Sequence, residues 1–85
     1  MKFASFREII DLWASRETLM EDVHRFRKNK RRKAPNVRLW YARDSIPSWW
    51  FDALVQAAQH RGFPDVTYPT LVTLWRARHP QPKEN

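Results

Sequence analysis

The stretch FREIIDLWASRETL, residues 6–19, decides the fold class. Its apolar residues recur at the spacing of one helix face, which predicts a first helix from about Ser5 to Trp13. Ser15 then has the side chain of an N-cap, and Glu17 lies favourably in the first turn of a second helix of about ten residues. The connection between them is very short, so the two helices should form a tight, angled pair.

Helical spacing of apolar residues continues beyond this pair, whereas the chain has one glycine and no β-branched run that favours strands. Three more helices are expected: one with Pro35 in its first turn, one from about Pro47 to His60 ended by Gly62, and one capped by Thr67, with Pro69 in its first turn, and ended by Pro80. Asp44 or Ser45 can cap the helix that starts at Pro47. We therefore expect an all-α, compact bundle of about five short helices. It forms one domain over residues 1–79, with a disordered tail over 80–85.

Composition limits the class of protein. The 85-residue chain has no cysteine, so neither a disulfide framework nor a thiolate metal site is expected. Five tryptophans and five phenylalanines supply the apolar area that a core of this size needs. Neither a signal peptide nor an apolar run of about twenty residues is present, so we expect a cytoplasmic protein without a membrane span.

The net charge of +7 is concentrated in one segment. Residues 1–24 carry −2, residues 25–43 carry +9 without a single acid, and residues 44–85 are balanced. A concentrated field of this kind is typical of a docking surface for a polyanion.

Three consecutive aromatics, Trp49, Trp50 and Phe51, cannot all be buried on one face of a helix. Trp50 falls on a core stripe, as do three other tryptophans, which argues against a general role of the tryptophans in stacking on unpaired bases. Trp49 and Phe51 are candidates for an interface, and a homodimer surface is the preferred use. The alternative is packing under the C-terminal helix.

Enzyme chemistry has almost no support in this sequence. The three histidines lie in different expected elements, and there is no Gly-rich phosphate loop and no nucleophile beside an orienting base. No catalytic residue, no cofactor, no metal and no small-molecule substrate is therefore expected.

Several blocks of the chain resemble a known class of regulators. These blocks are LWASRETL at 12–19, VRLW at 37–40, RDSIP at 43–47, Trp50 followed by ALVQAA at 53–58, and Val66 with Thr67. They look like the small phage and prophage-type helix-turn-helix transcriptional regulators of the Cro and repressor class, over roughly residues 6–75. The resemblance implies a helix-turn-helix fold that binds double-stranded DNA, usually as a dimer on half-sites about one turn apart.

The chain departs from this pattern between the second helix and the recognition helix. Asp22 and Trp40 are eighteen positions apart, and the glycine that the tight turn normally uses is missing. The surplus is a basic insertion, which forms either a loop or an extension of the second helix. We expect its cations to bind phosphates: Arg25, Arg27, Lys28, Lys30, Arg31, Arg32 and Lys33.

Residues after this insertion are the candidates for base readout. Asn36 and Arg38 have the side chains that read adenine and guanine in the major groove, and Tyr41 and Arg43 lie close to them in the sequence. Alternatively, Asn36 only occupies the first helical turn and Arg38 contacts phosphate. Val37 and Trp40 are expected in the core.

The function expected from these observations is sequence-specific binding of double-stranded DNA by a transcriptional regulator of phage or prophage type, associated with the bacterial nucleoid. Two alternatives stay open. One is a non-specific architectural or RNA-binding protein, and the other is a protein-interaction module that docks an acidic partner through the basic segment.

Overall fold

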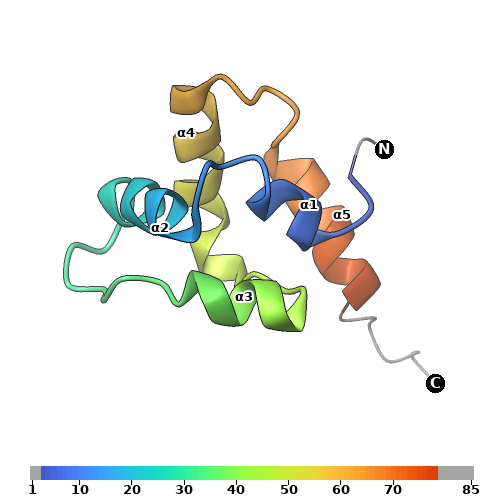
Figure 1. Ribbon diagram of the computed structural model, residues 1–85, viewed down its shortest axis with the longest axis horizontal. Helices are drawn as coiled ribbons and strands as arrows, with labels where there is room; N and C mark the ends of the chain where they lie inside the picture. The colour runs from blue at the N-terminus through green and yellow to red at the C-terminus, as the bar shows by residue number, and fades with distance from the viewer. Residues whose placement is uncertain (1–2, 79–85) are drawn as a thin grey trace.

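Five α-helices and one turn of 3-10 helix make up the fold over residues 3–78, the part of the chain that the computed structural model describes (Figure 1). In chain order these are α1 (Phe6–Ile10), α2 (Arg16–Arg25), α3 (Val37–Arg43), the 3-10 turn η1 (Ser48–Trp50), α4 (Phe51–Arg61) and α5 (Tyr68–Arg78). The expected all-α bundle of about five short helices is confirmed. The expected tail over 80–85, and the stop at Pro80, lie outside the described residues.

Polar side chains define several helix ends where the sequence predicts them. The Ser15 hydroxyl accepts a hydrogen bond from the backbone N–H of Thr18 at 3.0 Å, which caps the start of α2. Thr67 caps α5 in the same way through the N–H of Thr70, at 3.3 Å. Gly62 ends α4 with a φ of +80°, a left-handed conformation that side chains disfavour.

Other boundaries differ from the expectation. Helix α1 ends at Ile10, because residues 11–14 turn the chain toward the Ser15 cap. Helix α3 is capped by Asn36, whose side-chain oxygen accepts from the N–H of Leu39 at 3.1 Å, so Pro35 precedes the helix instead of occupying its first turn. The segment expected to be helical from Pro47 begins as η1, and neither Asp44 nor Ser45 caps it.

Helix α4 is the centre of the bundle and packs against α2, α5 and η1 (Figure 1). Its inward face is buried from Phe51 to Ala58, and Leu54 has no exposed surface. The small side chains of Ala57 and Ala58 let α2 approach closely. Helix α3 in turn packs against α1 and α2.

A buried carboxylate joins α2 to the end of α4. Asp22 is 4 % exposed and accepts hydrogen bonds from the Arg61 guanidinium at 2.6 and 3.0 Å and from the Trp13 indole N–H at 2.9 Å. The bonds from Arg61, helped by Trp13 and the nearby positive charges, lower the pKa of Asp22 against the opposing effect of burial. Asp22 is therefore held as a charged, fully bonded group within the core.

Candidate nucleic-acid interface

The basic insertion is a loop, which settles one alternative left open by the sequence. Helix α2 ends at Arg25, and residues 26–36 run to α3 without helical structure. Phe26, at the end of α2, is half-buried and lies against the His60 ring at 5.8 Å. This contact anchors the start of the loop on α4.

Hydrogen bonds within the loop give it a defined path. The Arg27 guanidinium donates to the backbone carbonyls of His24 at 2.5 Å and Lys30 at 3.1 Å. The side-chain oxygen of Asn29 accepts from the N–H of Arg31 at 3.0 Å, which closes a tight turn at the tip. The side chains of Arg27 and Asn29 thus make hydrogen bonds to backbone groups that would otherwise be hydrated by water.

Contacts to η1 and α4 tie the loop to the bundle. Lys28 forms an ion pair with Asp52 at 2.5 Å, and this contact raises the pKa of the lysine. Both partners are exposed, so the pair contributes little free energy on its own. The Arg32 guanidinium lies 5.9 Å from the Trp49 ring centre and 5.6 Å from that of Trp50, within the range of cation–π attraction.

The seven cations expected on phosphates therefore divide into two groups. Three are engaged by the protein itself: Arg27, Lys28 and Arg32. The others are exposed, and among residues 3–78 none of them has an ion-pair partner: Arg25, Lys30, Arg31 and Lys33. Lys30, Arg31 and Lys33 are free to meet an external anion, whereas Arg25 also interacts electrostatically with Asp22 and the first group shapes the loop.

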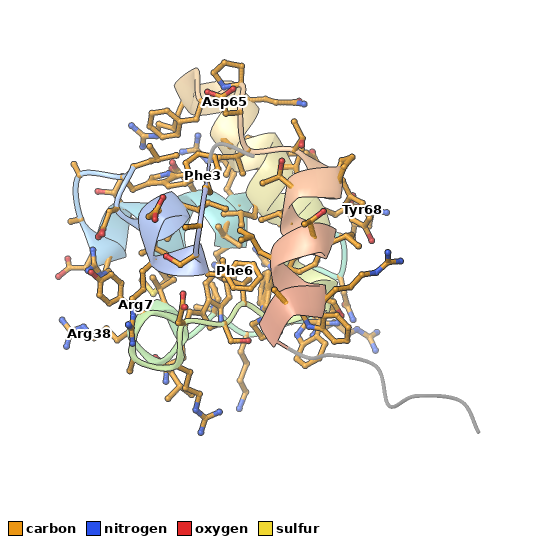
Figure 2. The ribbon with its side chains drawn as sticks, turned by 90° about the vertical axis from the view of Figure 1, so that its right-hand side faces the viewer. Phe3, Phe6, Arg7, Arg38, Asp65 and Tyr68 are labelled. Carbon is orange, nitrogen blue, oxygen red and sulfur yellow. The ribbon has the colours of Figure 1, made fainter. Side chains whose placement is uncertain are left out.

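Helix α3 presents a mixed outer face beside this loop. Arg38 is exposed and extends outward from α3 (Figure 2), beside a hollow that it lines together with residues of α2. Arg43 is also exposed, and so is Leu39, at 38 %. Val37 and Trp40 are buried, as predicted. The exposure of Leu39 was not anticipated, because the sequence pattern does not distinguish it from the neighbouring core positions.

Two other readout candidates are used inside the protein. The side-chain oxygen of Asn36 already accepts one hydrogen bond in the cap of α3, which leaves one of its two lone pairs and its amide N–H groups for a base. Tyr41 is half-buried: its ring lies 3.9 Å from the Arg16 guanidinium, and its hydroxyl donates to Asp11 at 3.3 Å. These contacts hold Tyr41 against Asp11 and Arg16, and its role in base readout stays a prediction.

Arg7 holds the carboxyl end of α3. Its guanidinium donates to the backbone carbonyls of Tyr41 at 2.7 Å and Ala42 at 2.9 Å, and its backbone N–H donates to Asp44 at 3.1 Å. The last carbonyls of a helix lack partners within the helix, so this arginine satisfies two of them and fixes the orientation of α3. The sequence does not reveal this role of Arg7, Asp11 and Arg16, because at least twenty-five positions separate them from the groups of α3 that they contact.

The three consecutive aromatics are separated by the fold. Trp49 is 62 % exposed, whereas Trp50 and Phe51 are buried. Phe51 packs between Phe6 and Tyr68, with ring centres 6.2 and 6.0 Å away. The expectation that Phe51 belongs to an interface is therefore wrong, because the residue begins α4 on its inward face, under α5. Trp49 alone of the two candidates is available for a partner.

Residues 3–78 show neither a cluster of metal ligands nor a membrane-spanning helix. Within residues 3–78, His, Asp and Glu form no group of three that would hold a metal ion. No helix in this range is both long and apolar enough to cross a membrane.

Comparison of the chain with protein-family models, with curated proteins and with solved structures finds no match.

Proposed function

We propose that this protein binds double-stranded DNA in a sequence-specific manner and regulates transcription. Helix α3 enters the major groove, with Arg38 and Leu39 toward the bases, and the exposed cations of the loop contact phosphates on the adjacent strand. The observation that carries the proposal is the position of Arg38: an exposed guanidinium on a short helix, directly after a loop whose exposed cations have no acid among them.

The chemistry of the outer face suits this use. An arginine reads guanine through two hydrogen bonds, and an apolar side chain such as Leu39 can contact the methyl group of thymine. Because Arg7 and the Tyr41 contacts fix α3, its outer face is presented in one orientation. Preorganisation of this kind reduces the entropy lost on binding.

The resemblance to Cro and repressor-type regulators agrees with this assignment of α2 and α3, although residues 26–36 replace the usual tight turn. In the proposed geometry α2 lies across the DNA backbone and supports α3. The loop extends the contact between protein and DNA along the phosphates. A regulator of this type acts at the nucleoid in the cytoplasm. Its expected homodimer would read two half-sites.

Selection of duplexes from a random pool, followed by footprinting, tests the proposal. A regulator should enrich one sequence and prefer it over random duplex by several kcal/mol at fixed salt. Binding that weakens with salt but shows no preference for one DNA sequence would instead indicate an architectural protein. Weak duplex binding at about 150 mM salt would indicate a module for an acidic protein partner.

Arg38→Ala should relax specificity at one base position of the selected site, by about 1–3 kcal/mol of discrimination. The measurement is the affinity of the variant for the selected duplex and for its single-base substitutions. Arg76→Ala, which removes an exposed cation of α5, serves as the charge-matched control and should leave the preference unchanged. A uniform loss of affinity across all duplexes would make Arg38 a phosphate contact and refute its role in readout.

A further inference from the structure

A groove of about 580 Å³ lies beside the proposed DNA-reading face, between α3, the end of the loop and η1. Its lining is largely apolar and includes Leu39 of α3, Trp49 of η1 and Trp75 of α5. The buried Trp40 and Trp50 also line it, with ring centres 6.1 Å apart. The groove therefore offers flat aromatic surface at the edge of the most basic part of the protein.

Trp49 forms a ridge between this groove and a second, smaller hollow of about 170 Å³. The smaller hollow is bounded by the loop at Lys28 and Asn29, and Arg32 lines both spaces together with Trp49. With 62 % of its surface exposed, the Trp49 indole remains accessible although the Arg32 guanidinium lies nearby. An exposed indole between two hollows can stack against a flat ligand.

Charge around the groove selects the kind of ligand. The residues that line it include the cations Arg32, Lys33 and Arg43 and no carboxylate. A second copy of this chain is a poor occupant, because a two-fold interface would bring like-charged rims together on a chain of net charge +7. An occupant with flat rings and negative charge, such as a nucleotide, satisfies both the aromatic walls and the basic rim.

We propose that this groove binds unpaired nucleotides of single-stranded DNA, with a base stacked on Trp49 and an adjoining phosphate near Lys33. Aromatic stacking combined with a basic groove is the usual means of binding single strands without regard to sequence. This activity goes beyond the reading of duplex DNA by α3 and does not depend on it. It gives the protein a second mode of contact wherever bases are unpaired.

Binding of a labelled oligothymidylate, compared with an abasic strand of equal length at the same salt, tests the proposal. The two strands carry the same phosphates, so a difference in affinity reports the bases. The wild-type protein should bind the oligothymidylate about tenfold more tightly or better, the range expected for stacking of one base. Trp49→Ala should abolish this difference and leave the affinity for the abasic strand unchanged.

Two further variants control for effects other than stacking. Trp49→Phe keeps an aromatic ring and should retain most of the preference for the base-containing strand. Leu12→Ala removes another exposed apolar side chain away from the groove and should change neither affinity. Circular dichroism of each variant checks that the fold is retained.

Four results would overturn the proposal. The first is equal affinity of the wild-type protein for the two strands, and the second is an unchanged preference in folded Trp49→Ala. The third is a shift of the sedimenting species from dimer to monomer in Trp49→Ala without an effect on strand binding, which would assign the groove to a second copy. The fourth is an affinity that depends on Trp49 for oligouridylate but not for oligothymidylate, which would exclude single-stranded DNA as the occupant.

Discussion

Asp22→Asn should lower the free energy of unfolding by about 2 kcal/mol, the scale of losing hydrogen bonds to a charged group. The asparagine loses the charge that Arg61 neutralises, and its NH₂ group is a donor where the site supplies only donors, from Arg61 and the Trp13 indole. Because 44 % of the Arg61 side chain is exposed, the substitution leaves no buried, unpaired charge. For a domain of this size the change corresponds to a drop in Tm of about 10 °C. Urea and thermal unfolding followed by circular dichroism measure both quantities.

Glu21→Gln is the matched control for this substitution. Glu21 is the exposed neighbour of Asp22 in α2, so its neutralisation should change the unfolding free energy by less than about 0.5 kcal/mol. Equal effects of the two substitutions would mean that Asp22 acts through the net charge of the protein and not through its buried contacts.

Acid should remove the stabilising contribution of Asp22. Its folded pKa lies below the ordinary value of 3.8, so the folded protein holds the proton less tightly than the unfolded chain does. The contribution is therefore complete above pH 3.8 and is lost as the pH falls from there through the lower, folded pKa. The difference in unfolding free energy between the wild-type protein and Asp22→Asn should shrink over this acidic range. A difference that stays constant down to the acid unfolding transition would contradict the assignment.

Replacement of Lys30, Arg31 and Lys33 together by alanine should weaken binding to every duplex and flatten its dependence on salt. Each phosphate contact contributes about 0.9 to the slope of log affinity against log salt, so loss of three contacts should reduce the slope by about 2.7. Between 50 and 200 mM salt the wild-type protein should therefore lose about 40-fold more affinity than the triple variant does. Titration of a labelled duplex at several salt concentrations gives both slopes.

The preference among sequences should survive in the triple variant, because phosphate contacts carry no base information. Asp52→Asn offers a structural comparison: it removes the partner of Lys28 and leaves the three mutated positions intact. It should have a much smaller effect on the slope. An unchanged slope in the triple variant would remove the loop from the interface.

Local sequence signals predicted most of the helices correctly. Ser15, Thr67 and Gly62 act within one turn of their own position, so their effects can be read from neighbouring residues alone. At one of the boundaries that differ, a tertiary contact competes with a local one. Asp44 bonds to the backbone of Arg7 in α1 and does not cap the following segment.

The candidate site was less accessible to sequence reasoning. The sequence shows where the cations are. Which of them are exposed and which are engaged depends on partners such as Asp52 and Trp49, which come many residues after the loop in the sequence. The groove beside α3 combines residues of α3, η1 and α5 that no spacing rule connects. For the same reason Arg7 is inconspicuous as a surface arginine of α1 until the fold brings it to the end of α3.

The sequence by itself determined that the protein is all-α and that its excess charge lies in one segment, because helical periodicity, caps and charge runs are properties of neighbouring residues. Only the tertiary structure decided which cations of that segment face outward, which aromatic of residues 49–51 remains exposed, and how α3 is held. Those outcomes depend on contacts between residues far apart in the chain. They therefore arise only when α2, α3 and α5 are assembled around α4.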